Sequence, residues 1–414
     1  MYNELLMYFE QHEILAKQQC GFRKELSINI AIGNFLNRVY AGVNEGKFGV
    51  GIFLDLQKAF DMVNHKILKE KLRHYGVRGM PLQLIESFLS DRKQYVKIDK
   101  NKSSILTSSI GTPQGSVISP LLFLIFINDI VNSSDILNFS LFADDTCIYA
   151  SDSNLENLYV RVNHEILQVE KWIKANLLSL NINKTVYLLF SGNIIFSRTP
   201  PLMIFNSMIS RKNVTKFLGI LIDEKLTWKP HVKCLLGKIS RVAGIMSKIK
   251  NTMTTQSLKM IYYGLIYPFI HYGIVFWATV AKREFDKIFR IQKKVVRFIA
   301  GVGRFEHSEP IFKKINILKL CDVKNLETAK FIFSDIGHNR FFSFENRSHI
   351  HSYGTRNNLN FVLPHPRTDL MRNSVFYTGL KDFERISMEI KNSTSKNSFK
   401  TKLKTSLLSF YSLT

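Results

Sequence analysis

Two adjacent acids, Asp144 and Asp145, interrupt an otherwise apolar run, LFADDTCIYA at residues 141–150. Like charges buried side by side are costly unless something neutralises them. Residues 137–150 predict two strands joined by a tight turn over Ala143–Thr146, because apolar runs flank the acids on both sides. Such a hairpin presents both carboxylates at one edge of a sheet.

A third acid, Asp55, ends a second buried strand that is predicted at residues 47–55, KFGVGIFLD. If the hairpin and this strand are neighbours in one sheet, all three carboxylates converge at one edge. Hard oxygen ligands suit Mg²⁺, and two such ions about 3.5–4 Å apart can activate an attacking 3′-hydroxyl and stabilise a leaving pyrophosphate. The alternative is that paired aspartates are ordinary turn residues. The apolar flanks and the third acid weaken this alternative but leave it open.

The order of the other elements predicts an α+β fold. Asp61 is expected to N-cap a helix whose apolar stripe ends at Gly76. Further elements follow: a helix near 82–89, a strand near 95–98, a loop at 111–120, a buried helix over 121–130, an amphipathic helix over 154–176 and a strand near 187–190. Helices mixed with a hairpin favour an antiparallel sheet layered with helices over a doubly wound parallel sheet. After about residue 232 the chain becomes mainly helical and strongly basic, which predicts a domain boundary.

The charge balance points to a polyanionic partner. The 414 residues include 57 Lys and Arg against 33 Asp and Glu, a formal charge of +24. Nucleic acid is the first interpretation and an anionic membrane surface the second. The four cysteines form no C-x-x-C pair, which speaks against a zinc site and for a reducing compartment.

Residues 260–281 contain no Asp, Glu, Lys or Arg and are long enough to span a bilayer. Pro268 and His271 in mid-segment favour a buried helix or helix pair instead.

Several motifs, in order, resemble the reverse transcriptases of non-LTR (LINE-type) retrotransposons, especially jockey-like elements. They are GFRKELS (21–27), FLDLQKAFDMVNHKIL (53–68), GTPQGSVISPLLFLIFINDI (111–130), FADD (142–145), LSLNINKT (178–185) and FLGILIDEKLTWKPHV (217–232). IYPFIHYGIVFW and IQKKVVRFIAGV resemble the region downstream of the polymerase. Only about twenty residues precede GFRKELS, so the resemblance also implies an N-terminally truncated chain.

The resemblance implies a role for each matched residue. Metal binding falls to Asp55, Asp144 and Asp145, and the Leu56 carbonyl is expected to help hold a metal. Phe60 is expected to block a ribose 2′-hydroxyl, and Gln114 and Gly115 are expected to contact the incoming nucleotide. Lys184 is expected to protonate the leaving pyrophosphate. The hairpin at Phe217, Leu218 and Gly219 is expected to grip the primer end. Plainer alternatives are a core residue for Phe60, a helix-entry loop for Gln114, a solvated charge for Lys184 and a core strand for 217–219.

The resemblance further implies the fold, partners and place of action. A right-hand polymerase palm with partial fingers would span residues 1–232, a helical, basic thumb 233–305, and a C-terminal extension of unknown role 306–414. The basic face of residues 282–297 can contact phosphates without reading sequence. Expected partners are an RNA template, a DNA primer and dNTPs, with Mg²⁺ as the cofactor and Mn²⁺ as its alternative. The nucleus is the expected location, without stable membrane association.

Two other functions stay open at the level of sequence. One is a catalytically inactive, nucleic-acid-binding remnant of such an element. The other is an RNA-dependent RNA polymerase, against which the bulky Phe60 speaks.

Overall fold

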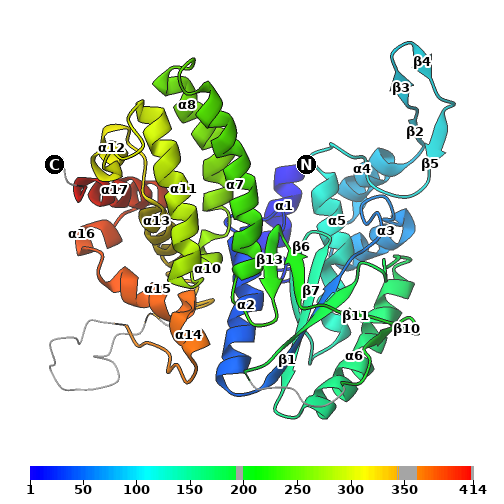
Figure 1. Ribbon diagram of the computed structural model, residues 1–414. Coiled ribbons are helices and arrows are strands. Elements are labelled where there is room, and N and C mark those ends of the chain that lie inside the picture. The colour runs from blue at the N-terminus through cyan, green and yellow to red at the C-terminus, as the bar shows by residue number, and fades with distance from the viewer. Residues whose placement is uncertain (193–198, 343, 345–360, 412–414) are drawn as a thin grey trace. The chain divides into compact units, whose positions relative to one another are not determined.

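The computed structural model describes residues 1–192, 199–342, 344 and 361–411. Its chain divides into two compact units, Met1–Leu218 and Gly219–Thr414 (Figure 1). Unit 1 combines a mainly antiparallel sheet with helices, which confirms the predicted α+β class.

The centre of unit 1 is a five-stranded sheet in the order β11–β8–β1–β7–β6. Its strands are β1 (Phe48–Leu54), β6 (Asn138–Phe142), β7 (Asp145–Asp152), β8 (Val186–Phe190) and β11 (Ser210–Arg211). Strand β1 runs antiparallel to both of its neighbours, β7 and β8, whereas β11 runs parallel to β8. The strands predicted at 47–55, 137–150 and 187–190 are confirmed.

Helices α2 (Ile28–Asn44) and α6 (Leu155–Ala175) cover opposite faces of this sheet. On one face the Phe35 ring of α2 meets the Phe53 ring of β1, with centroids 5.5 Å apart. On the other face Val50 and Ile52 join the same core cluster as the buried residues of α6. A strand that is buried on both faces reads as a continuous apolar run, as β1 does. Gly51 makes room for α2, since a Cβ there would lie 3.0 Å from the Phe35 ring.

The remaining elements of unit 1 surround the sheet. Its other helices are α1 (Tyr2–Gln11), α3 (His65–His74), α4 (Gly79–Leu89), α5 (Ser119–Ile127) and the 3₁₀ helix η1 (Asn128–Ser133). Its short strands are β2 (Arg92–Gln94), β3 (Lys97–Ile98), β4 (Asn101–Lys102), β5 (Leu106–Ser108), β9 (Met203–Ile204), β10 (Ser207–Met208) and β12 (Val214–Phe217).

The predicted N-cap at Asp61 is wrong, because Asn64 caps α3. The Asn64 Oδ1 accepts hydrogen bonds from the amides of Lys66 and Ile67 at 3.0 and 3.2 Å. Residues 60–63 bond to another part of the chain instead: Phe60 O accepts from the Thr112 amide at 3.0 Å. A tertiary contact therefore delays the helix start by one turn.

The strand predicted near 95–98 is only partly correct. It is split into β2 and β3, which belong to a narrow ribbon, β2–β5, that extends beyond the rest of unit 1 (Figure 1). The break falls at Tyr95 and Val96, where the Val96 amide donates to Ser103 Oγ at 2.9 Å.

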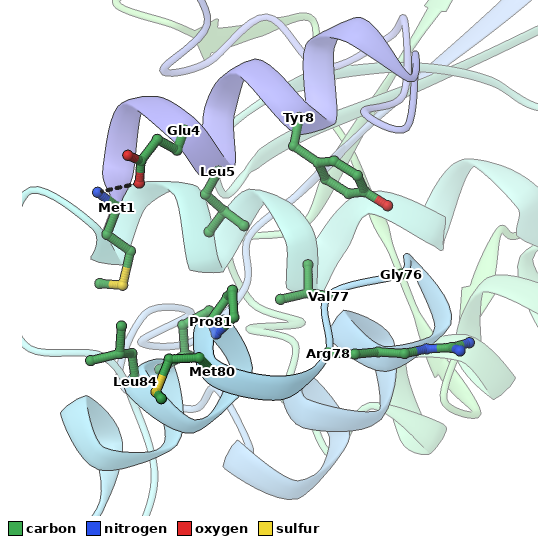
Figure 2. A pocket seen from close by; sticks show the side chains of 11 residues that line it. Met1, Glu4, Leu5, Tyr8, Gly76, Val77, Arg78, Met80, Pro81 and Leu84 are labelled. Carbon is green, nitrogen blue, oxygen red and sulfur yellow. Dashed lines mark ion pairs between the residues drawn. The ribbon is translucent and has the colours of Figure 1, made fainter.

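An apolar cavity of about 520 Å³ lies between α1 on one side and α4 with the residues just before it on the other. Figure 2 shows Leu5 and Tyr8 of α1 facing Val77 and Pro81 across it. The residues that line this cavity include none of the predicted site residues, so it is separate from the chemistry considered below.

Unit 2 is helical apart from β13 (Ile220–Asp223), as far as the chain is described. Its helices are α7 (Lys229–Ile249), α8 (Thr255–Ile261), the π-helix η2 (Tyr262–Ile266), α9 (Tyr267–His271), α10 (Ile274–Trp277), α11 (Lys282–Ala300), α12 (Ser308–Lys314), α13 (Leu320–Phe333), α14 (Asp369–Asn373), α15 (Val375–Glu384), α16 (Met388–Lys391) and α17 (Lys396–Ser409).

The apolar segment 260–281 is broken into short helices, as Pro268 and Gly273 indicate. Gly273 has a left-handed φ of +60° at the N-cap of α10. Among the described residues, none of the helices has both the length and the apolar character that crossing a bilayer requires.

Candidate active site

The register of the sheet brings Asp55 and Asp145 together. In the pairing of β1 with β7, Leu54 lies opposite Thr146. One further step along both strands places Asp55 opposite Asp145. Because side chains alternate along a strand, Asp55 shares the face of Phe53, and Asp145 shares the face of Tyr149. The ring of Phe35 contacts both aromatic residues, so this is the α2 face of the sheet.

The hairpin turn presents Asp144 beside Asp145. Phe142 pairs with Asp145, so Ala143 and Asp144 are the two loop residues. Ala143 has a left-handed φ of +55°, which a two-residue hairpin loop requires and which L-residues other than glycine, asparagine and aspartate rarely adopt. The predicted hairpin with its acids at the turn is therefore what the chain forms.

A loop after α6 fixes the backbone of Asp55. Its carbonyl accepts from the Asn181 amide at 2.8 Å, and its amide donates to Thr185 Oγ1 at 3.3 Å. Leu56 forms a bridge with Leu180 in the same stretch. Lys184 belongs to this loop, and its Nζ lies 3.8 Å from Asp55 Oδ2. The loop LNINKT thereby places an ammonium group beside the first acid.

The three carboxylates influence one another electrostatically. Partial burial raises the pKa of Asp145, and the negative charges of Asp144 and Asp55 raise it further, while Lys216 opposes the effect. A carboxylate whose ionisation is disfavoured by its neighbours is one that a bound cation would stabilise. The excess negative charge at the end of the sheet is thus only partly offset by Lys184 and Lys216.

These carboxylates suit a divalent cation by their chemistry. Oxygen donors from Asp side chains are the ligands that Mg²⁺ prefers. Within the described parts of the chain, however, no three His, Cys, Asp or Glu side chains stand close enough together to hold a metal ion as they lie. The carboxylates therefore suit a divalent cation in the type and charge of their donor atoms. To bind the ion together, their side chains would have to move closer to one another.

A second cluster gathers Phe60 and the loop that contains Gln114. The Phe60 ring stacks on Phe123 with centroids 4.4 Å apart. The Gln114 side chain is exposed and donates to Asp61 Oδ1 at 3.0 Å. Gly115 has a φ of +82°, and a Cβ there would meet no atom within 4 Å. The structure thus joins the FLDLQKAFD and GTPQG motifs through backbone and side-chain contacts.

Residues 217–219 form a tight turn whose first residue, Phe217, is buried in the core. The Phe217 ring is buried against Phe53, with centroids 5.4 Å apart, and against Phe35 at 6.0 Å. Leu218 and Gly219 both have left-handed φ values, +45° and +82°. The side chain of Phe217 is therefore part of the core.

Three residues of the site were missed from the sequence. Lys216 precedes the predicted FLG motif, and Thr185 follows Lys184 directly. Gln19 lies two residues before GFRKELS, and its side chain binds the backbone of Ala143. The signal available for Lys216 and Gln19 was a position beside a matched motif, whereas Thr185 is the last residue of the motif LSLNINKT.

The reverse transcriptase (RNA-dependent DNA polymerase) family matches residues 1–222, and the chain belongs to it. The match covers the whole sheet of unit 1, with Asp55, Asp144 and Asp145. It confirms the resemblance drawn from the ordered motifs.

Relatives from mobile elements agree with this assignment. The chain is 27% identical over 335 residues to the RNA-directed DNA polymerase from mobile element jockey of Drosophila melanogaster, which covers 77% of this chain and 36% of that protein. It is 26% identical to the probable RNA-directed DNA polymerase from transposon BS of the same species, over 80% of this chain and 37% of that one. The chain thus spans little more than a third of the length of these relatives.

Solved structures of telomerase from Candida are also similar. Telomerase from Candida tropicalis in complex with a TWJ fragment of telomeric RNA aligns with 100% of this chain and 56% of its own, at 13% identity and a TM-score of 0.44. The Candida albicans enzyme, also with a TWJ fragment of telomeric RNA, aligns with 77% of this chain and 56% of its own, at 14% identity and a TM-score of 0.42.

Proposed function

We propose that this chain is an RNA-directed DNA polymerase that extends a DNA primer on an RNA template with dNTPs. The observation that carries the proposal is the register that sets Asp55 opposite Asp145, with Asp144 in the adjoining turn, in a member of the reverse transcriptase family. The names of the mobile-element relatives support the same reaction.

The acids would hold Mg²⁺, as two ions, with Mn²⁺ as the alternative. When bound, these ions neutralise the carboxylates and polarise the reacting oxygens. Lys184, held near Asp55, is proposed to deliver a proton to the leaving pyrophosphate. The carbonyl of Leu56 is proposed as a further oxygen ligand, because its neighbours in the bridge fix the local backbone.

Phe60 is proposed to select deoxynucleotides. Its ring is held by the stack with Phe123, so it cannot easily yield to a ribose 2′-hydroxyl. Gln114 and Gly115 are proposed to lie along the incoming nucleotide, since the open space at Gly115 allows close approach to the backbone. The turn 217–219 is proposed to hold the primer end.

The larger division of labour is likewise a proposal. Residues 1–232 would form the palm and partial fingers, 233–305 a thumb, and 306–414 an extension, part of which lies outside the described residues. The break between compact units at Gly219 supports a boundary in this part of the chain. Priming on chromosomal DNA would place the reaction in the nucleus.

Primer extension on an RNA template tests the proposal. The purified chain should extend a DNA primer with dNTPs and Mg²⁺, and Asp144→Asn should lower kcat at least about 100-fold because it removes charge that the transition state needs. The matched control is Asp135→Asn, an exposed acid shortly before β6, which should stay within about twofold of wild type.

Two results would overturn the assignment. Equal activity of Asp144→Asn and wild type would remove Asp144 from the site. A folded wild-type chain that extends no primer but binds RNA in a salt-dependent manner would favour a nucleic-acid-binding remnant instead.

A further inference from the structure

We propose that Gln19 is a positioning residue that holds the hairpin turn of Asp144 and Asp145 in its working geometry. This inference rests on the proposed function, because it concerns how the acids of that site are kept in place. Gln19 lies outside every motif that carried the resemblance.

The Gln19 side chain binds both backbone polar groups of one residue in the turn, Ala143. Its Oε1 accepts from the Ala143 amide at 3.0 Å, and its Nε2 donates to the Ala143 carbonyl at 3.4 Å. The same Oε1 accepts from the Gly21 amide at 2.8 Å. Gln19 is only 1% exposed, so these bonds form away from water and their loss would leave buried backbone groups without partners.

The turn needs such a partner because it is strained. Ala143 holds φ at +55°, a conformation that costs an L-residue roughly 1–2 kcal/mol. Glycine, which pays no such cost, is the residue that hairpin turns usually place there. A non-glycine residue stays in this region only where its surroundings enforce it, and Gln19 supplies that enforcement.

The segment that carries Gln19 is itself anchored on both sides. Next to Gln19, the Cys20 amide donates to Leu141 O at 2.9 Å, and the Leu141 amide donates to Gln18 O at 3.1 Å. These bonds lay the segment along β6, beside the turn. Gly21 must be glycine here, since a Cβ would lie 2.4 Å from the Ala143 nitrogen.

Arg23 and Asn128 brace the same segment from outside. The Arg23 guanidinium donates to Glu10 at 2.9 and 2.6 Å and to the Ala16 carbonyl at 2.8 Å. The Asn128 Oδ1 accepts from the Ala16 amide at 2.7 Å. Arg23 is therefore occupied by structural contacts, and its contribution to the site passes through the backbone that presents Gln19.

Amide hydrogen exchange in the metal-free protein tests directly whether Gln19 stabilises the turn at Ala143. Gln19→Leu keeps the volume of the side chain and removes the amide group. The Ala143 amide should then exchange about tenfold faster, the effect of losing one buried hydrogen bond, while core amides of β1 keep their rates. The affinity for Mn²⁺ alone, followed by water relaxation, should fall as the acids lose their fixed arrangement.

Steady-state kinetics adds a readout specific to positioning. Gln19→Leu should lower kcat roughly 10- to 100-fold and leave the KM for dNTP within about twofold, since it displaces the acids but touches no nucleotide. Adding Ala143→Gly should restore part of kcat, because glycine adopts the turn without strain. Should Gln19→Leu fail to fold, Gln19→Asn keeps the amide but shortens its reach, and it should act in the same direction.

The comparison variant is Asn128→Leu, which removes the contact to the Ala16 amide but no contact to the turn. It should lower the thermal unfolding temperature to a similar extent and reduce kcat much less than Gln19→Leu does. An unchanged Ala143 exchange rate in Gln19→Leu, or an equal loss of kcat in Asn128→Leu, overturns the proposal. A wild-type chain without polymerase activity would overturn the proposed function, while amide exchange and Mn²⁺ binding would still decide the role of Gln19.

Discussion

At the scale of single residues, the negative carboxylates of the site lie close enough to repel one another. The chain places Asp145 opposite Asp55 and next to Asp144 on a half-exposed edge, with Lys184 near Asp55 and Lys216 acting on Asp145. The repulsion between the carboxylates is unfavourable, and a bound cation would reduce it. The repulsion is therefore a property of the site that can be measured without substrate.

The ionisation of Asp145 should respond to its neighbour. The pKa of Asp145 is raised by partial burial and by the charges of Asp144 and Asp55. Asp144→Asn removes one of these charges, so the pKa of Asp145 should fall toward its ordinary value in the metal-free protein. The carboxyl ¹³C shift of Asp145, followed against pH by NMR, measures this change, and Asp135→Asn provides the control. An unchanged titration in Asp144→Asn would show that the two acids do not interact.

The sequence predicted the acids and Lys184, but not the residues that hold them. Asp55, Asp144 and Asp145 stand out because charge is rare within apolar strands. Gln19 gave no such signal, since its function depends on a turn that lies more than a hundred residues away in the chain. A contact of that kind is created by the fold and leaves no local pattern in the sequence.

At the scale of elements, strong local patterns were read correctly and tertiary contacts caused the errors. The hairpin β6–β7 and helix α6 follow from their periodic apolar residues. The N-cap of α3 was misplaced because residues 60–63 bond to the 111–112 backbone. Residues 28–44 carry a helical apolar repeat behind Ser27, whose side chain caps α2, so this helix could have been predicted and was not.

Helix α7 carries a buried histidine that should make stability depend on pH. His231 is 3% exposed, its Nδ1 accepts from the Leu221 amide at 3.2 Å, and its Nε2 has no hydrogen-bond partner among the described residues. Burial, with Lys238 nearby, lowers its pKa to about 4. The unfolded chain, with an ordinary pKa near 6.5, binds a proton first as pH falls.

The free energy of unfolding should therefore fall between about pH 6.5 and pH 4, by up to about 3 kcal/mol from this group. The contribution is fully present above pH 6.5 and is lost as pH falls through the folded pKa. His231→Gln, which cannot titrate, should remove that part of the slope in denaturant unfolding measured across this range. His338→Gln, an exposed histidine in the same unit, should leave the slope unchanged. An equal slope in wild type and His231→Gln would contradict the assignment.

At the scale of the whole molecule, the positive charge is concentrated in unit 2. Residues 219–414 contain 33 Lys and Arg against 14 Asp and Glu, a formal charge of +19, whereas residues 1–218 contain 24 against 19, a charge of +5. The sequence indicated a strongly basic region after about residue 232, and the boundary at Gly219 now allows the charge of each unit to be counted. Unit 1, which contains the acids, is thus nearly balanced in charge, whereas unit 2 holds most of the excess positive charge.

Helix α11 concentrates this charge on one exposed side. Arg290 and Lys294 are one turn apart and exposed, while Ile288 and Val295 are buried. Phosphate contacts by such side chains release counterions, so affinity for RNA should fall steeply with salt. With about six contacts to single-stranded RNA, the dissociation constant should rise roughly 300-fold between 50 and 200 mM salt.

Neutralising Arg290 and Lys294 together, as Arg290→Gln with Lys294→Gln, should reduce the slope of log affinity against log salt by about 1.4, because each lost contact removes about 0.7. Fluorescence anisotropy with a labelled RNA measures that slope. The control pair, Lys66→Gln with Lys171→Gln, removes two exposed charges from helices α3 and α6 of unit 1 and should leave the slope within about 0.3 of wild type. If both pairs reduce the slope equally, binding follows net charge alone and α11 has no special place in it. If only the α11 pair does, the helical unit holds the nucleic acid while the acids of unit 1 act on it.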